Sequence, residues 1–182
     1  VDSSQEAAKR MQQLISQMLT LADVERPDAA LSMQQLDLAA IATKAALEME
    51  SIAYEKCVTL ETALPEACVL RGNPDYLQRI VSSLLENALK YEPAGGRVQL
   101  TLTQDKRRVQ LSVQNFGSTI PAEDLPHVFD RFYRSDKSRK SESGSFGLGL
   151  AITKEMVEKL SGEISVSSSA EDGTVFQVIL CR

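Results

Sequence analysis

Residues 73–91 read NPDYLQRIVSSLLENALKY, and this stretch predicts a long helix with one buried face. Asn73 is a favourable N-cap, and Pro74 suits the first helical position because its missing N–H group would have no partner there. Apolar side chains recur at helical spacing and form one stripe, made of Leu77, Ile80, Val81, Leu84, Leu85 and Ala88. We therefore expect a helix over 74–90 that packs this stripe into the core of a domain.

A polar stripe runs along the neighbouring face of the same helix. Ser83, Asn87 and Lys90 follow one another at steps of four and three residues, with Tyr91 beside them. Asparagine is unfavourable inside a helix because its side chain competes for backbone hydrogen bonds. The stripe is either an ordinary solvated face or part of a binding site. In such a site an Asn87 oxygen binds a hydrated metal ion, Lys90 lies near phosphates and Tyr91 packs on a ligand.

The rest of the chain predicts further helices together with paired strands. Helices are expected at 3–25, 38–54 and 148–160, with a short helical piece near 122–131. Strands are expected at 58–62, 67–70, 97–103, 108–114, 162–168 and 173–180, and the last four form two hairpins. Hairpins mixed with helices indicate an α/β (α+β) sandwich, a mixed and mainly antiparallel sheet with helices on one face, preceded by a helical arm.

The helical arm carries its own apolar pattern. Ala7, Met11, Leu14, Met18 and Leu21 are spaced 4-3-4-3, the a/d spacing of helices that pack in bundles. A single helix cannot bury that seam, so the arm either docks on the following domain or belongs to a bundle completed by missing sequence and a second subunit. The sustained spacing favours the bundle, and we expect the chain to be a fragment of a longer protein.

Composition argues against several classes of protein. The 182 residues are 43% hydrophobic and 25% charged, and no apolar run approaches the ~18–20 residues of a membrane span. A net charge of −5 argues against a nucleic-acid partner, which normally requires a basic surface. The single histidine, His127, nearly excludes a histidine-rich metal site. The three cysteines fit reduced thiols of a cytosolic protein better than a disulfide framework.

Two segments contain glycines where a ligand could approach the backbone. Residues 115–121 (NFGSTIP) follow a predicted strand, and residues 144–150 (GSFGLGL) open the helix expected at 148–160. Glycines at a helix N-terminus let backbone amides approach an anion, which the helix dipole also favours. The second segment is neither a Walker loop nor a dinucleotide fingerprint.

A basic stretch lies between these two segments. It starts within residues 129–134 (FDRFYR), continues to Ser143 and includes Arg131, Arg134, Lys137, Arg139 and Lys140. An ordinary solvated loop is one interpretation of such a stretch. Beside a glycine-rich segment in an acidic chain, we instead expect a mobile lid over a polyphosphate, at about 121–146.

Four segments in this order resemble the ATP-binding domain of sensor histidine kinases. Residues 84–91 (LLENALKY) are similar to that family's N box, and Asn115-x-Gly117 to its first glycine box. Residues 129–134 are similar to its F box and residues 147–150 (GLGL) to its second glycine box. The resemblance covers roughly residues 35–182 and implies the fold of the gyrase, chaperone and histidine kinase ATPases.

The resemblance also implies a site for ATP and Mg²⁺. Asn87 would hold the metal ion, Lys90 would approach the phosphates, and Tyr91 would lie against the adenine. Asn87 and Lys90 would be the catalytic residues. The nucleotide-binding positions implied by the motifs are Asn87, Lys90, Tyr91, Asn115, Gly117, Phe132, Arg134, Gly147, Leu148 and Gly149.

The chain departs from the family pattern at three positions. Asn115 stands where the family usually has Asp, whose carboxylate accepts a hydrogen bond from the adenine amine; an amide oxygen can also accept that bond. Thr119 replaces the second glycine of the same box. Ser83 stands one turn before Asn87, where related ATPases carry a catalytic Glu, and without that base rapid ATP hydrolysis is not expected.

These features predict the ATP-binding catalytic domain of a protein-histidine kinase. It would donate the γ-phosphate of Mg-ATP to a histidine on a phosphoacceptor helix outside this sequence, for relay to a response regulator. His127 does not match the family's phosphoacceptor motif. Two alternatives are a nucleotide-binding regulatory module that lost catalysis and uses its arm as a dimerisation scaffold, and an ATPase of the same superfamily.

The expected organisation has three parts. Residues 1–26 resemble the second helix of the dimerisation and phosphoacceptor bundle, 27–36 form a linker, and 37–182 form the ATP-binding domain. The resemblance implies a homodimer in the intact protein and a response regulator receiver domain as partner. It also implies a cytoplasmic location, with any membrane attachment supplied by N-terminal segments that this sequence lacks.

Overall fold

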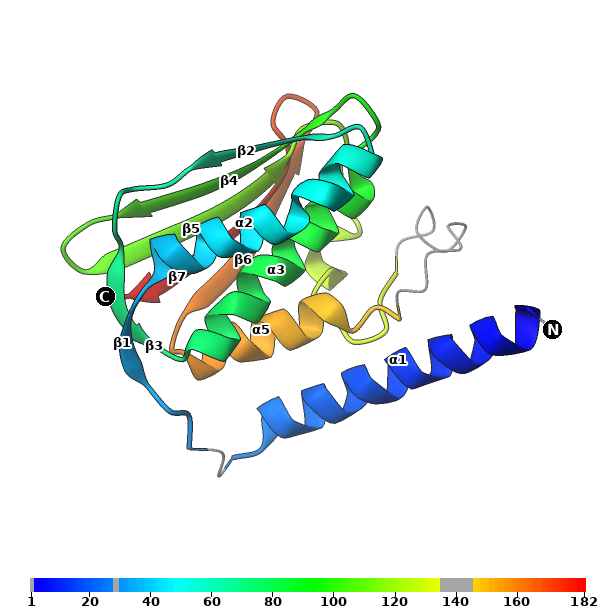
Figure 1. Ribbon diagram of the computed structural model, residues 1–182, viewed down its shortest axis with the longest axis horizontal. Helices are drawn as coiled ribbons and strands as arrows, with labels where there is room; N and C mark the ends of the chain where they lie inside the picture. Colours follow the sequence, from blue (N-terminus) through cyan, green and yellow to red (C-terminus); the bar gives the residue numbers. More distant parts are fainter. Residues whose placement is uncertain (1, 28–29, 135–145) are drawn as a thin grey trace.

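The computed structural model describes residues 2–27, 30–134 and 146–182. The helices are α1 (Asp2–Glu25), α2 (Leu38–Glu55), α3 (Pro74–Tyr91) and α5 (Gly149–Lys159), with a 3-10 turn η1 (Leu125–His127). The strands are β1 (Gln34–Asp37), β2 (Thr59–Ala63), β3 (Val69–Gly72), β4 (Arg97–Gln104), β5 (Arg108–Asn115), β6 (Glu163–Ser169) and β7 (Gly173–Cys181). Helices α2, α3 and α5 lie on the same side of the main sheet (Figure 1).

Five strands form the main sheet in the order β2-β4-β5-β7-β6. Only β2 and β4 pair in parallel, and the other neighbours are antiparallel. This arrangement confirms the expected mixed, mainly antiparallel sheet with helices on one face. A second, two-stranded sheet of β1 and β3 was not predicted.

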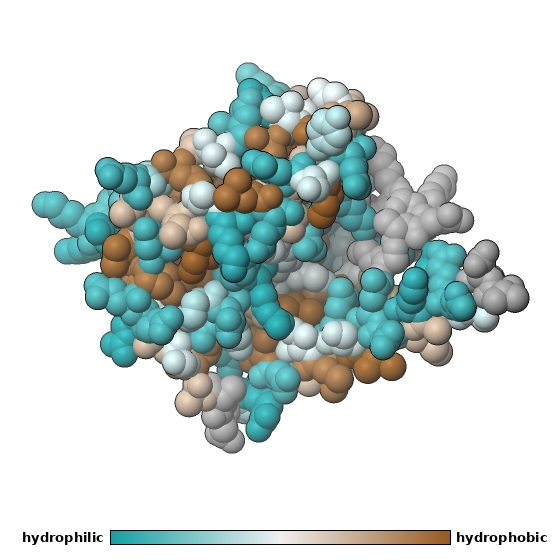
Figure 2. All heavy atoms as spheres, viewed as in Figure 1, coloured by the Kyte–Doolittle hydropathy of each residue, from teal (hydrophilic) through white to brown (hydrophobic). Residues whose placement is uncertain are grey.

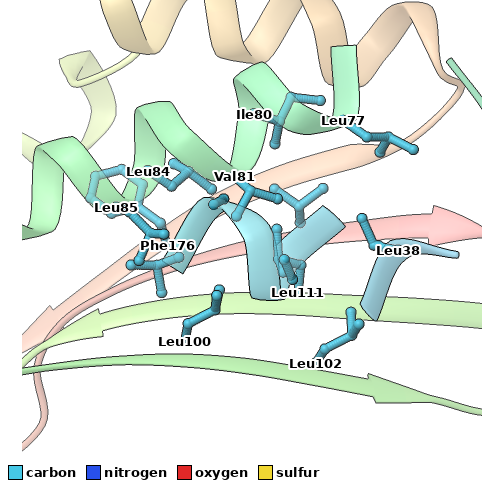
Figure 3. Close-up of a cluster of buried hydrophobic side chains, with 14 of the residues drawn as sticks. Leu38, Leu77, Ile80, Val81, Leu84, Leu85, Leu100, Leu102, Leu111 and Phe176 are labelled. Carbon is cyan, nitrogen blue, oxygen red and sulfur yellow. The ribbon is translucent and has the colours of Figure 1, made fainter. Parts of the chain in front are cut away.

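The core lies between α3 and the sheet, as the apolar stripe of residues 73–91 predicts. Leu84 and Leu85 are fully buried, and the sheet supplies Leu100, Leu111 and Phe176 from the opposite side (Figure 3). Burying side chains of this size stabilises the fold by about 1.5–3 kcal/mol each. The packing turns one face of α3 inward and leaves the Asn87 face for other contacts.

The ends of α2 and α3 are set by their capping residues. Asn73 caps α3 by accepting a hydrogen bond from the Tyr76 N–H. Asp37 caps α2 through the Ala39 N–H and also accepts from the Cys68 N–H, 31 residues along the chain. One carboxylate therefore caps the start of α2 and connects it to Cys68, the residue before β3.

Three local predictions differ from the structure. Residues 34–36, placed in the linker, form β1 together with Asp37, and this strand pairs with β3. The strand expected at 67–70 lies at Val69–Gly72, because its position is set by the β1 ladder rather than by the apolar run alone. The helical piece expected at 122–131 is reduced to η1.

Helix α1 lies alongside α5 (Figure 1) and buries only part of its apolar surface. Leu21 and Val24, near its C-terminal end, are buried, whereas Met11 and Met18 of the expected seam are 65% and 50% exposed. Figure 2 shows hydrophobic side chains along the outer edge of the molecule over α1. Among the described residues, no helix is both long enough and apolar enough to cross a membrane.

Candidate functional site

Helix α3 places Asn87, Lys90 and Tyr91 at its C-terminal end, next to one another on or beside the polar stripe. The Lys90 ammonium group lies 5.2 Å from the centroid of the Tyr91 ring, within range of a cation–π interaction. Asn87 is half-buried one turn earlier. The structure thus groups the three residues that the N box predicts.

Lys90 is one of several cations at this end of the molecule. Burial lowers the pKa of Lys90 below its ordinary value, and the charges of Arg134 and Lys56 lower it further. Arg134 comes from the F box and Lys56 from the C-cap of α2, so three separate segments bring positive charge together. A cluster of cations is unfavourable by itself and favours a bound polyanion.

The N-terminus of α5 provides a second anion-binding feature. Leu148 is its N-cap residue and makes no side-chain hydrogen bond to the first turn, so the first N–H groups are left uncapped by a side chain. The Leu148 side chain itself is fully buried, which limits its part in ligand binding to the backbone. A Cβ on Gly149 would meet no atom within 4 Å, so the space in front of this residue is open.

Gly147 is required by the backbone rather than by a ligand. Its φ of +74° lies in the left-handed region, and a Cβ here would lie 2.6 Å from the Tyr133 carbonyl oxygen. The Gly147 carbonyl accepts a hydrogen bond from the Phe132 N–H at 2.9 Å. The second glycine box and the F box are therefore joined through their main chains.

A pair of hydroxyl groups connects α3 to the start of α5. The Thr153 Oγ1 lies 2.9 Å from both the Ser83 Oγ and the Gly149 carbonyl oxygen. A hydroxyl has one hydrogen, so both contacts are satisfied when Ser83 donates to Thr153 and Thr153 donates to Gly149. Ser83, predicted only as a missing base, thus helps to hold Gly149 against the Asn87 helix.

The other end of the site is formed where β5 ends. Asn115 is only 2% exposed, and its amide nitrogen donates to the Ser118 Oγ at 2.8 Å. The Ser118 carbonyl accepts from Thr174 at 3.0 Å, and the Gly117 N–H donates to the Glu92 carboxylate at 2.9 Å. With its nitrogen used in this way, the Asn115 Oδ1 is the atom left to accept a hydrogen bond.

The F box is divided between the core and the surface. Phe129 packs edge-to-face on Phe176, with ring centroids 6.1 Å apart. Phe132 is exposed and has a left-handed φ of 61°, an unusual conformation for a bulky residue. Arg131 forms ion pairs with Glu25 of α1 and, at 4.0 Å, with Glu155 of α5.

Part of the predicted lid lies outside the described residues, including Lys137, Arg139 and Lys140. His127 is exposed beside η1, where its Nδ1 lies 2.8 Å from the Asp130 carboxylate, as expected for a surface histidine. Among the described residues, no group of three or more acidic, Cys or His side chains forms a metal cluster. A cavity of about 670 Å³ beside β1 and β3 is lined by none of the predicted site residues.

Sequence reasoning missed three residues of this region. No motif or spacing in the sequence singled out Glu92, Thr153 or Lys56. The contacts of Glu92 and Thr153 are with distant parts of the chain, and Lys56 matters only through its charge near Lys90, so no local pattern identifies them.

Known proteins are similar to this chain in sequence and in fold. Residues 72–182 match the family described as histidine kinase-, DNA gyrase B-, and HSP90-like ATPase. The sensor histidine kinase CusS of Escherichia coli K12 is 36% identical over 178 residues, which cover 98% of this chain and 37% of CusS. The sensor histidine kinase RppB of Synechocystis sp. is 33% identical over 94% of this chain and 38% of RppB.

Solved structures agree with this result. The mycobacterial sensor histidine kinase MprB matches 81% of this chain and 96% of its own, with 28% identity and a TM-score of 0.69. Full-length ShkA in complex with AMPPNP has a TM-score of 0.82 over 96% of this chain; at 24% identity this supports the fold alone. The chain spans little more than a third of the length of the curated relatives CusS and RppB.

Proposed function

This chain belongs to the histidine kinase-, DNA gyrase B-, and HSP90-like ATPase family as the ATP-binding domain of a sensor histidine kinase, and from this premise we propose that it is the phosphoryl donor of a two-component system. It binds Mg-ATP and transfers the γ-phosphate to a histidine on a phosphoacceptor helix outside the 182 residues. The phosphoryl group then passes to an aspartate of a response regulator receiver domain. The observation that carries this proposal is the uncapped N-terminus of α5 in a site that also holds the Lys90 and Arg134 cations.

The two ends of the site differ in charge, which orients the nucleotide. Lys90, Arg134 and the first turn of α5 attract the phosphates. The buried amide of Asn115, with Gly117, suits the polar edge of the adenine base, and Tyr91 offers a ring face for it. Transfer of the γ-phosphate requires mainly positioning and charge neutralisation.

The residues present fit a bound Mg²⁺ ion. The Asn87 side-chain oxygen is a hard neutral ligand, and Mg²⁺ usually combines one or two such protein ligands with water and phosphate oxygens. When bound, the ion neutralises phosphate charge. Asn87 would hold the ion, Lys90 would approach the phosphates, and Phe132 and Arg134 lie on the lid side of the site.

Transfer to a histidine is favoured over hydrolysis by the state of Ser83. Its hydroxyl group is engaged with Thr153, and it carries no carboxylate that could activate water. The site therefore orients ATP without a general base at this position. An acceptor histidine must supply the nucleophile.

The proposal extends to the intact protein. Residues 1–26 form the second helix of a dimerisation bundle, and residues 27–36 form the linker that follows it. Residues 37–182, called the body below, bind ATP under a lid at about 121–146. The exposed apolar side chains of α1 support pairing within a homodimer. The domain acts on the cytoplasmic side of a membrane sensor.

The test compares this chain with the same protein extended by its natural upstream sequence. With Mg²⁺ and γ-labelled ATP, the chain should bind nucleotide and stay unlabelled, whereas the extended protein should acquire acid-labile label. Asn87→Ala and Lys90→Ala should each abolish labelling. His127→Gln, a matched change of an exposed lid residue, should leave it unchanged.

Stable acid-labile label on the 182-residue chain would contradict the assignment of the acceptor. Calorimetric titration with Mg-ADP distinguishes the alternatives. No binding at millimolar nucleotide would favour the scaffold, and steady ATP turnover by the chain alone would favour an ATPase.

A further inference from the structure

Glu92 is a buried acid that the proposed chemistry does not use. It is the C-cap of α3, directly after Tyr91, and its side chain turns inward and is 5% exposed. A buried carboxylate is costly unless hydrogen bonds replace its lost water. Its contacts therefore need an explanation.

Both carboxylate oxygens of Glu92 accept hydrogen bonds from the main chain. Oε1 accepts from the Arg97 N–H at 3.0 Å, at the start of β4. Oε2 accepts from the Gly117 N–H at 2.9 Å, in the loop after β5. The two N–H groups flank the first rung of the β4–β5 ladder, where Val98 pairs with Asn115. Beyond this rung the Phe116 N–H donates to the Arg97 carbonyl at 3.2 Å, and Glu92 adds two side-chain bonds to the same end of the ladder.

The nearby arginine does not take over this role. The Arg97 guanidinium lies 3.9 Å from the Phe116 ring centroid and 3.6 Å from the Glu61 carboxylate. In the part of the chain that the structure describes, the recorded partners of the Glu92 carboxylate are backbone donors and no cation. Its charge therefore strengthens hydrogen bonds whose geometry fixes the backbone.

Two glycines make room for this carboxylate. A Cβ on Gly96 would overlap the Glu92 Oε1, and a Cβ on Gly117 would lie 2.6 Å from it. No ordinary contact is that short, so Gly117 is needed here because Glu92 occupies the space. The loop and the acid are fitted to each other.

We propose that Glu92 is a positioning residue that sets the base end of the nucleotide site. It holds Gly117, and with it the loop 115–118 that carries Asn115, at a fixed place relative to Tyr91, the residue directly before Glu92 in the chain. This inference rests on the proposed function, because that function assigns Asn115 and Tyr91 to the base. The phosphate end, at Lys90 and α5, is held by other contacts and does not depend on Glu92.

The experiment measures the affinity of the 182-residue chain for two probes by calorimetry: Mg-ATP, and Mg-tripolyphosphate, which has phosphates but no base. Glu92→Gln keeps the side-chain volume but replaces one carboxylate oxygen by an NH₂ group, which cannot accept a hydrogen bond from the main-chain N–H group that faces it. Mg-ATP should bind about tenfold more weakly, as for the loss of one charge-assisted hydrogen bond. Binding of Mg-tripolyphosphate should change less than twofold.

Two further variants complete the design. Glu61→Gln makes the same chemical change in an exposed acid that contacts the Arg97 side chain, and it should leave both affinities unchanged. Gly96→Ala places a methyl group where the Glu92 Oε1 lies, at a residue that is not assigned to the nucleotide, so it displaces the carboxylate and should reproduce the selective loss of Mg-ATP. It tests the proposal independently if Glu92→Gln does not fold.

The outcomes separate this inference from the function on which it rests. If the unsubstituted chain binds neither probe, the proposed function fails. If it binds both, and the folded Glu92→Gln or Gly96→Ala variant weakens both probes equally or weakens neither, Glu92 has only a structural role and the proposal is overturned. A folded variant is one that keeps a cooperative thermal transition.

Discussion

The surroundings of Lys90 disfavour its positive charge. Burial, Arg134 and Lys56 all disfavour its protonated form, so its pKa lies below the ordinary 10.5 in the folded chain. A bound polyphosphate reverses this balance because its negative charge favours the ammonium form. The free protein therefore carries an unfavourable charge that binding relieves.

Stability and nucleotide affinity should respond to alkaline pH in opposite directions. Between the lowered pKa of Lys90 and 10.5, the unfolded chain binds more protons at this site than the folded chain, so the free energy of unfolding rises with pH. Affinity for ADP falls over the same window as Lys90 loses its proton. Urea unfolding measures the stability and calorimetry measures the ADP affinity, both for the unsubstituted chain and for Lys90→Met at each pH. The difference between the two proteins removes the contribution of other lysines and tyrosines that titrate in the same range.

Lys90→Met should remove both of these slopes. If the variant and the unsubstituted chain show the same pH dependence of ADP affinity, Lys90 does not bind the phosphates as a cation. A pH-independent difference in stability would show that its ammonium group is not disfavoured in the folded state.

The sequence predicts site residues best where they lie on one regular element. Asn87 and Lys90 are found because helical spacing places them together beside a buried stripe, and the structure confirms that placement. Glu92 and Thr153 are missed because their roles depend on Gly117 and Ser83, which lie 25 and 70 residues away. No spacing rule describes contacts that only the folded chain creates.

At the scale of elements, the start of α5 combines two glycines with different tasks. Gly147 adopts a left-handed conformation against the Tyr133 carbonyl, whereas the space beside Gly149 is open. A side chain at residue 147 strains the backbone, while one at residue 149 enters the space that a phosphate would occupy. The two positions therefore separate folding from binding.

Substitution by alanine should split these two properties. Gly147→Ala should lower the free energy of unfolding by at least about 1–2 kcal/mol, since a left-handed conformation and a close contact are both unfavourable for alanine. Gly149→Ala should leave stability unchanged or raise it by up to about 1 kcal/mol through helix propensity, yet weaken ADP binding. Urea unfolding and titration of both variants provide the check, and a Gly149→Ala variant with unchanged affinity would contradict the phosphate site.

Strands that form because they pair with a distant part of the chain were predicted less well than helices whose apolar residues recur at regular spacing. Helices α2, α3 and α5 agree with their expected positions within one or two residues because their apolar residues recur at helical spacing, and α3 is also marked by the Asn73 cap. Strand β1 has the sequence QQLD, which carries no strand signal, and it forms because β3 pairs with it. The shift of β3 from the expected 67–70 has the same cause.

On the scale of the whole molecule, α1 is attached to the body at one end. Leu21 and Val24 are buried there, Glu25 pairs with Arg131, and the Lys159 ammonium group donates to the Arg26 carbonyl at 2.8 Å. The exposed apolar residues of α1 lie outside this contact. The body's own core is formed almost wholly from residues 38 onward, so its stability should depend little on α1.

The place where the body begins can be tested by truncation. Before residue 37, β1 pairs with β3, and the Ser32 carbonyl accepts a hydrogen bond from the Asn73 side chain. A chain of residues 30–182 should therefore fold cooperatively and bind Mg-ADP within about twofold of the full chain.

A chain of residues 37–182 loses the β1 ladder and the half-buried Leu36, and should be less stable than residues 30–182 by about 2 kcal/mol. Urea unfolding of the two chains measures the difference. Equal stabilities would place β1 in the linker, and loss of nucleotide binding by residues 30–182 would show that α1 contributes to the site.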